Sequence, residues 1–100
     1  MPILEHALLP VIPGREGEFE AAFAEARGIV ASMPGFRSLR LERGIETPNH
    51  YLLLIEWDTL EDHEVGFRGS PEYQQWKALL HHFYDPFPEV THFGRRPVGR

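Results

Sequence analysis

The stretch Tyr51–Trp57, which reads YLLLIEW, decides the fold. Side chains of a β-strand point alternately to its two faces. One face therefore takes Tyr51, Leu53, Ile55 and Trp57, and the other takes Leu52, Leu54 and Glu56. A strand that is apolar on both faces is expected to be covered on both faces.

The segments before this strand predict its neighbours. Phe36–Arg43 alternates in the same way, and turn residues between the two segments predict a hairpin. Ile3–Ile12 predicts a further strand that is again apolar on both faces. Glu18–Met33 predicts a helix, because its apolar residues recur at steps of three and four.

The following stretch, TLEDHEVGFRGSPEYQQW, predicts two short helices with a break at Gly69. Thr59 and Asp62 resemble a capping box at the start of the first helix. Ser70 can cap the second helix, and Pro71 suits its first turn. A last strand is predicted over Phe87–Phe93.

The predicted order is β-α-β-β-α-α-β, which favours an α+β domain over residues 1–94. A four-stranded antiparallel sheet with its helices on one face satisfies this order. The other face would remain uncovered, so we expect a second copy to pack against it in a homodimer. Residues 95–100 predict a disordered, basic tail.

Composition excludes several classes of protein. The 100 residues carry a net charge of −5 and no clustered cationic surface, which disfavours binding to nucleic acid. Cysteine is absent, which removes disulfides and thiol chemistry. No signal peptide and no apolar run of membrane-spanning length are present, so we expect a cytoplasmic protein without a membrane partner.

His63 and Arg68 are the first candidates for chemistry. His63 shares one side of its predicted helix with Leu60 and Phe67, so it points towards the core. It is either a buried histidine that bonds a backbone carbonyl or a group that transfers protons near neutral pH. Arg68 is either a solvated cation at a helix end or a guanidinium that holds a carboxylate or phenolate oxygen.

The candidates for ligand contacts are mostly aromatic. Tyr73 and Trp76 are either core or the polar-tipped wall of a pocket. Glu5 is the odd acid of an apolar strand, and it could orient His63 or a substrate hydroxyl. Pairing with an arginine of the second strand (Arg37, Arg40 or Arg43) is equally compatible with the pattern.

Metal and nucleotide chemistry have no motif in this sequence. His81 and His82 are neighbours on a helix and do not face one another, so we interpret them as solvated surface rather than as a chelate. No glycine-rich nucleotide loop, zinc-protease motif or nucleophile elbow occurs. We therefore expect neither a metal nor a cofactor.

Longer segments resemble a known family. LEHALLPVIPGREGEFEAAFAEA, MPGFRSLRLERG, YLLLIEWDTLEDHEVGFRGSPEYQQW and FPEVTHF are similar to the antibiotic biosynthesis monooxygenase (ABM) family of the dimeric α+β barrel superfamily. The resemblance implies a ferredoxin-like protomer, a sheet that pairs with a partner's sheet, and a pocket between sheet and helices. Some members oxidise quinol-like substrates with O2 and no cofactor, and others degrade haem.

The family's functional residues do not transfer directly. The asparagine, tryptophan and histidine of the haem-degrading members align near Ala7, Phe67 and Lys77, and none matches. The histidine pair that many members carry around the Ser-Pro step aligns with Phe67 and Glu72, while His63 lies one turn earlier.

Three hypotheses follow. The leading one is a cofactor-independent monooxygenase that oxidises a small electron-rich aromatic or quinol-like substrate, with His63 as base and Arg68 stabilising the oxyanion. Its pocket walls would be Trp57, Phe67, Tyr73 and Trp76. The second is a dimeric, non-catalytic module that binds a small hydrophobic molecule. The third is haem binding through His63, His6 or His92, the last two being otherwise interpreted as core or barrel-lining groups.

Overall fold

The computed structural model describes residues 2–94 of the chain. The predicted basic tail, residues 95–100, lies outside the described residues. The elements are β1 (Ile3–Pro10), α1 (Glu16–Ala31), β2 (Phe36–Arg43), β3 (His50–Trp57), the π-helix η1 (Asp62–Phe67), α2 (Pro71–Leu80), the 3₁₀ turn η2 (His81–Phe83) and β4 (Val90–Gly94).

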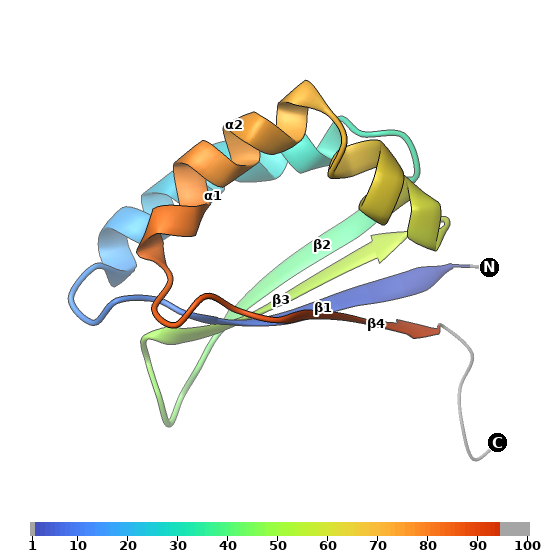
Figure 1. The fold of residues 1–100 in the computed structure, drawn as a ribbon. Coiled ribbons are helices and arrows are strands. Elements are labelled where there is room, and N and C mark those ends of the chain that lie inside the picture. The colour runs from blue at the N-terminus through green and yellow to red at the C-terminus, as the bar shows by residue number, and fades with distance from the viewer. Residues whose placement is uncertain (1, 95–100) are drawn as a thin grey trace, which may run out of the picture.

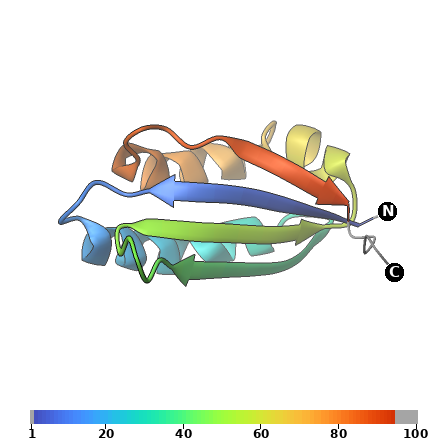
Figure 2. The ribbon, with the colours of Figure 1, turned by 90° about the horizontal axis from the view of Figure 1, so that it is seen from below.

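The four strands form one antiparallel sheet in the order β2-β3-β1-β4. Both α-helices cover the same face of this sheet, and within residues 2–94 no helix lies on the other face (Figures 1 and 2). This arrangement is the predicted ferredoxin-like α+β fold. The two central strands, β1 and β3, are the strands whose sequences are apolar on both faces.

The core lies between the sheet and the helices. In β3 the burial alternates strictly, and the residues that face the helices are the more buried ones. The helices contribute the aromatic and aliphatic side chains predicted from their spacing. The buried set includes Ala7, Leu9, Phe19, Phe23, Val30, Leu53, Ile55, Trp57, Phe67, Trp76 and Leu80.

Local polar contacts fix the stretch that carries η1 and α2. The Thr59 hydroxyl accepts a hydrogen bond from the Asp62 backbone N–H at 3.1 Å. Ser70 caps α2 by accepting a hydrogen bond from the Tyr73 N–H at 3.1 Å, and Pro71 stands in the first turn as predicted. Gly35 has a φ of 83°, and a Cβ there would overlap the Asp62 carboxylate, so only glycine allows β2 to begin so close to η1.

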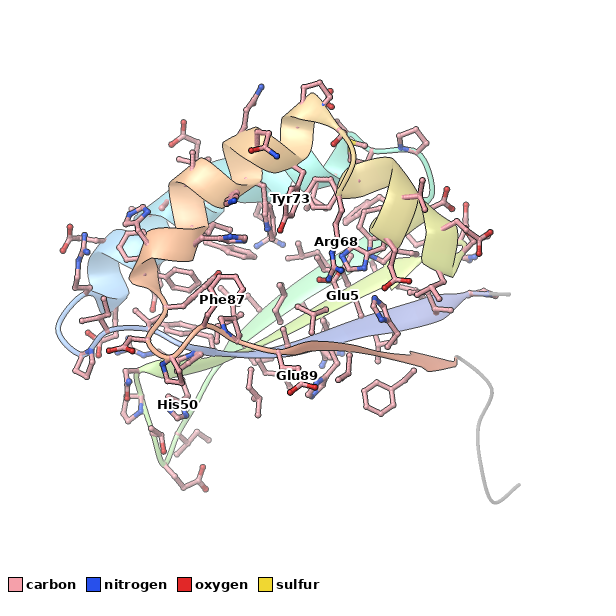
Figure 3. The ribbon with its side chains drawn as sticks, viewed as in Figure 1. Glu5, His50, Arg68, Tyr73, Phe87 and Glu89 are labelled. Atoms are coloured by element: carbon pink, nitrogen blue, oxygen red, sulfur yellow. The ribbon has the colours of Figure 1, made fainter. Side chains whose placement is uncertain are left out.

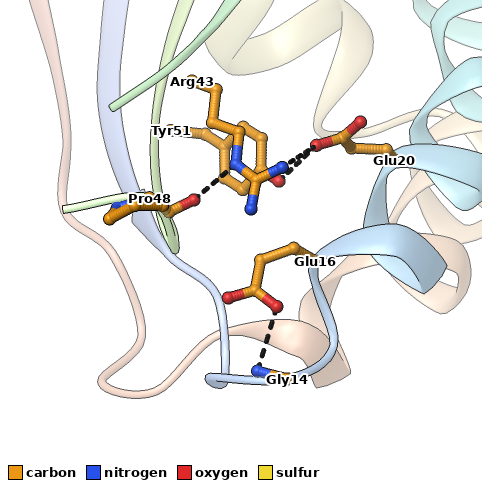
Figure 4. A network of polar contacts seen from close by, with 6 residues as sticks. All are labelled: Gly14, Glu16, Glu20, Arg43, Pro48 and Tyr51. Carbon is orange, nitrogen blue, oxygen red and sulfur yellow. Dashed lines mark hydrogen bonds and ion pairs between the residues drawn. The ribbon is translucent and has the colours of Figure 1, made fainter. Parts of the chain in front are cut away.

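A polar network ties α1 to the far end of the sheet (Figure 4). The Tyr51 hydroxyl donates to Glu20 Oε2 at 2.5 Å, and Arg43 Nη1 lies 3.3 Å from the same oxygen. Arg43 Nε also donates to the Pro48 carbonyl at 2.7 Å. These contacts hold the first turns of α1 against β2 and β3, away from the candidate site.

The final strand is shorter than the sequence predicted. It was expected over Phe87–Phe93, but pairing with β1 begins only at Val90. Pro86 and Pro88 have no backbone N–H to donate to a neighbouring strand, so the segment before Val90 cannot extend the ladder. Phe87 and Pro88 instead line a cavity beneath α2.

The uncovered sheet face is partly apolar. Its side chains come from the alternate positions of β1, β3 and β4, and they include Leu4, His6, Leu8, Leu52, Leu54 and Phe93. Leu8 and Phe93 are 58% and 53% exposed. Within residues 2–94, no helix is long and apolar enough to cross a membrane. The predicted homodimer would cover this face, and it stays a prediction.

We expect the substitution Leu8→Glu to abolish that dimer. The variant would bury an unpaired carboxylate on each protomer in a surface that must lose water on association. Sedimentation equilibrium should give a dimer for the wild type and a monomer for the variant. Val65→Glu, which changes an exposed apolar residue of η1, is the matched control and should remain dimeric. A monomeric wild type at high concentration would contradict the prediction.

Candidate functional site

Glu5 is a carboxylic acid on the buried face of β1. The alternation of the strand places it between Ile3 and Ala7 on the side of the helices, where it is only 5% exposed. The Trp57 indole N–H donates a hydrogen bond to Glu5 Oε1 at 2.9 Å. No arginine of β2 contacts Glu5 among the described residues, so the alternative of an ion pair with that strand is not realised.

His63 reaches the same carboxylate oxygen from η1. Its Nε2 lies 3.3 Å from Glu5 Oε1, and its ring stacks on the Trp57 indole with centroids 5.5 Å apart. The side chain is 3% exposed. Its ring nitrogens contact side chains rather than a backbone carbonyl, which distinguishes between the two interpretations of this histidine.

The π-helical geometry of η1 helps to place His63. The Arg68 N–H donates to the His63 carbonyl at 3.1 Å, a bond that spans five residues instead of four. Such widened turns are frequent at functional sites. This one turns both His63 and Phe67 towards the sheet, and leaves Arg68 at the helix end.

His92 completes the row on its outer side. His63 Nδ1 lies 2.8 Å from His92 Nε2, so one of the two rings must donate its N–H to the other. His92 is half-buried on β4, where it pairs in register with Glu5. The sequence analysis placed His92 as a core or barrel-lining group or as a candidate haem ligand, and not as a partner of His63. The contact depends on the register between β1 and β4, which the sequence does not reveal.

Burial shifts the pKa values of Glu5 and His63 in opposite directions. Burial raises the pKa of Glu5 to about 7, although the hydrogen bond from Trp57 and the charge of Arg68 both act to lower it. Burial, with Arg68 and His92 adding to its effect, lowers the pKa of His63 to about 3. His63 is thus neutral near pH 7, so its 3.3 Å contact with Glu5 is a polar contact of a neutral imidazole rather than an ion pair.

A cavity of about 440 Å³ opens beside this pair, between the sheet, η1 and α2. Its lining is mostly apolar and aromatic with a few convergent polar groups, as is typical of small-molecule sites. Figure 3 shows Glu5, Arg68 and Tyr73 facing this space, with Phe87 on the segment that leads into β4. The lining residues are Glu5, Ala7, Leu9, Leu53, His63, Phe67, Arg68, Tyr73, Trp76, His81, Tyr84, Phe87, Pro88 and Val90.

Most of the residues selected from the sequence meet at this cavity. Glu5, His63, Arg68, Phe67, Tyr73 and Trp76 all line it. Trp57 does not, because it is fully buried beneath His63 and acts on the site only through its hydrogen bond and its stacking. Trp57 therefore holds Glu5 and His63 in position and does not form part of the cavity wall.

Several lining residues were missed. His81 was expected on the solvated surface together with His82, but it lines the cavity, and only His82 is exposed. Tyr84 and Phe87 belong to the irregular segment after α2, whose path local patterns do not predict. Burial and the neighbouring Tyr73 raise the pKa of Tyr84 above its ordinary value, so this phenol is neutral near pH 7.

The described residues do not favour a metal or haem. Within residues 2–94, no group of three or more histidine, aspartate or glutamate side chains could hold a metal ion. Both ring nitrogens of His63 already have partners, which leaves neither for an axial bond to iron. His6 belongs to the opposite face of the sheet.

Comparisons with known proteins agree with the predicted family. Residues 2–79 match the sequence model of the family described as antibiotic biosynthesis monooxygenase. The uncharacterised protein YczJ of Bacillus subtilis (strain 168) is 54% identical over 91 residues, which cover 91% of this chain and 96% of that protein.

Solved structures are similar over almost the whole chain. A crystal structure from Bordetella bronchiseptica, of a protein named for the same family, has a TM-score of 0.90 at 36% identity and covers 96% of this chain and 98% of its own. SnoaB, a cofactor-independent oxygenase from Streptomyces nogalater, has a TM-score of 0.82 at 21% identity, covering 99% and 98%. At that identity, the second likeness shows the fold alone.

The burial of Glu5 predicts a pH-dependent stability. Folded Glu5 keeps its proton to about pH 7, whereas its ordinary pKa is 4.5. The wild type should therefore lose stability relative to Glu5→Gln as the pH rises from 4.5 through 7, by at most about 3 kcal/mol. Urea unfolding of both proteins at pH 5 and pH 8.5 measures this change.

Glu25→Gln, at an exposed position of α1, is the control and should show no such difference between the two pH values. A gap between wild type and Glu5→Gln that is equal at pH 5 and pH 8.5 would contradict the assignment of a buried, readily protonated Glu5.

Proposed function

Because the chain belongs to the antibiotic biosynthesis monooxygenase family, we propose that it is a cofactor-independent monooxygenase that oxidises a small electron-rich aromatic or quinol-like substrate with O2. The observation that carries the proposal is a buried carboxylate, Glu5, that faces a cavity lined largely by apolar and aromatic residues, beside Arg68. Membership of the family supports oxygenase chemistry, and the cofactor-independent oxygenase SnoaB shares the fold.

The first step is removal of a proton from the substrate. An ionised phenol gives up an electron to O2 far more readily than a neutral one, so a base is the group that starts the reaction. Glu5 Oε1 is occupied by Trp57 and His63, which leaves Oε2 for a substrate hydroxyl in the cavity. A carboxylate whose pKa is about 7 is a suitable base at neutral pH.

This assignment revises the role expected of His63. Both of its ring nitrogens are engaged, one with Glu5 and the other with His92. In the proposal, His63 therefore orients Glu5 and holds one of its oxygens, while the carboxylate itself takes the proton. Arg68 lines the same cavity, and its guanidinium stabilises the phenolate oxygen that forms.

The later steps need no further reductant. The phenolate passes one electron to O2, and the resulting superoxide and substrate radical combine to form a C–O bond. Loss of water from the hydroperoxide leaves a quinone, so that one phenol and one O2 give one quinone and one H2O. The aromatic walls, among them Phe67, Tyr73 and Trp76, exclude water from these intermediates.

Oxygen consumption with a panel of phenols, quinols and anthrones tests the proposal. We expect the wild type to consume O2 with at least one class, and Glu5→Gln to lower kcat by about 10²- to 10⁴-fold. Arg68→Met should lower kcat as well, because it removes the charge that faces the oxyanion. Arg27→Met, at an exposed position of α1, is the control and should retain activity.

The alternative of a non-catalytic binding module predicts a different result. Ligands of the same panel would raise the melting temperature without any consumption of O2. Activity that is unchanged in Glu5→Gln would overturn the proposed mechanism.

A further inference from the structure

The cavity is elongated along β1. Glu5 and Leu9 both line it, and the step from one to the other covers about 13 Å of extended strand. Arg68 lies at the Glu5 end, where its charge acts on the carboxylate (Figure 3). Phe87 lies towards the other end, on the segment that leads into β4 (Figure 3). The cavity therefore has two ends, and the proposed reaction uses only the end at Glu5.

His81 and Tyr84 form the far end of the cavity. Val11, which follows β1, forms a β-bridge with Tyr84. The Asp85 N–H donates to the Pro10 carbonyl at 2.9 Å, so the segment after α2 is fixed beside the end of β1. His81 follows the last turn of α2, and its ring centroid lies 6.1 Å from that of Tyr84. Both side chains line the cavity.

The polar tips near this end have no partner within residues 2–94. No hydrogen bond or ion pair of the described chain involves the hydroxyl of Tyr73 or Tyr84 or the ring nitrogens of His81. None of the three residues is exposed, and no side-chain nitrogen or oxygen of the described residues is both sealed from solvent and unpartnered. Their polar atoms are therefore accessible, and the cavity is the space that all three residues border.

The far end can donate hydrogen bonds to one uncharged oxygen. Burial, with the charge of Lys77 adding to its effect, lowers the pKa of His81, so its ring is neutral near pH 7 and carries one N–H donor. Burial and the neighbouring Tyr73 raise the pKa of Tyr84, so its hydroxyl keeps its proton. A carbonyl oxygen has two lone pairs and can accept from both groups at once. A carboxylate is less suited, because Arg68 is the lysine or arginine that lines the described cavity, and it lies at the Glu5 end.

Membership of the family assigns no role to this end. Residues 2–79 match the family model, and His81, Tyr84 and Phe87 follow that range. The ring centroid of Phe87 lies 4.9 Å from that of His81 and 6.0 Å from that of Tyr84. Phe87 lines the cavity and is also 61% exposed, so it lies at the mouth. The far end is therefore placed where its side chains can select a ligand that enters.

We propose that His81 and Tyr84 form a second binding subsite, which holds an uncharged acceptor oxygen, such as a carbonyl, at the end of an elongated phenolic ligand. The subsite rests on the proposed function only for the identity of the other end, the hydroxyl that reacts at Glu5. His81 and Tyr84 bind and orient the ligand, and no step of the reaction passes through them. A single phenol ring spans less than half of the length from Glu5 to Leu9, so its one oxygen cannot engage both ends.

A structural role, or contact with water alone at the mouth, is the competing explanation. Tyr84→Phe and His81→Phe keep an aromatic ring in the cluster and remove its polar atoms. If the two rings only pack, each variant changes the binding of all ligands alike. If their polar tips hold the ligand oxygen, each variant weakens only the ligands that carry this oxygen.

Paired ligands test the subsite. The probes are para-alkylphenols of increasing chain length that end in a methyl ketone, each paired with the phenol in which CH2 replaces the C=O. Dissociation constants are measured by titration calorimetry without O2, so that no ligand is oxidised. At the best chain length, the ketone should bind the wild type about tenfold more tightly than its pair, and each variant should lower this preference by about three- to tenfold.

His82→Phe is the matched control. His82 is the exposed neighbour of His81 and does not line the cavity, so the control should leave the affinity for both members of each pair unchanged. Equal or undetectable binding of the paired ligands to the wild type at every chain length would overturn the subsite. A preference that either Tyr84→Phe or His81→Phe retains in full would overturn it as well. A matched carboxylate that binds more tightly than the ketone would overturn the assignment of an uncharged oxygen.

The binding experiment separates failure of the subsite from failure of the proposed function. A ketone preference that the variants lose, in a protein that consumes no O2 with any phenol, would keep the subsite and remove the oxygenase. Oxygen consumption that is lost in Glu5→Gln, in a protein without any ketone preference, would keep the oxygenase and remove the subsite.

Discussion

The site depends on one constraint: a carboxylic acid must be accommodated inside an apolar core. An unpaired buried carboxylate is costly, so Glu5 is tolerated only with partners at hydrogen-bond distance. Trp57 comes from the neighbouring strand β3, and His63 comes from η1. The register of β1 on β3 and the closeness of η1 to the sheet are therefore both conditions for Glu5 to remain buried.

The same constraint explains why a cavity exists at this place. A carboxyl needs polar neighbours and cannot be surrounded by close-packed aliphatic side chains, so the helices do not close over Glu5 on β1 as they do over Ile55 on β3. The break at Gly69 separates η1 from α2 and leaves Arg68 beside the gap. A Cβ at Gly69 would lie 2.7 Å from the Val65 carbonyl, so this break is built into the sequence.

The sequence predicted the individual strands, helices and caps, and it left open the contacts between segments that are far apart in the chain. Alternation in YLLLIEW and the caps at Thr59 and Ser70 predicted elements, faces and even the inward direction of His63. The partner of Glu5 stayed open between His63 and an arginine, because that choice depends on how separate elements come together. The contact between His92 and His63 was missed for the same reason, since the register that places His92 opposite Glu5 is not visible in the sequence.

The order of the strands determines how far Glu5 and His92 lie from solvent. Glu5 lies on β1, which has a neighbour on each side, whereas His92 lies on β4, at the edge of the sheet. A central strand keeps its inward side chains from water, and an edge strand meets water along one side. The carboxylate of Glu5 on β1 and the histidine opposite it on β4 thus lie between the interior and the surface within one pair of strands. The order β3-β1-β4 thus places a deeply buried carboxylate on the strand next to the edge of the sheet.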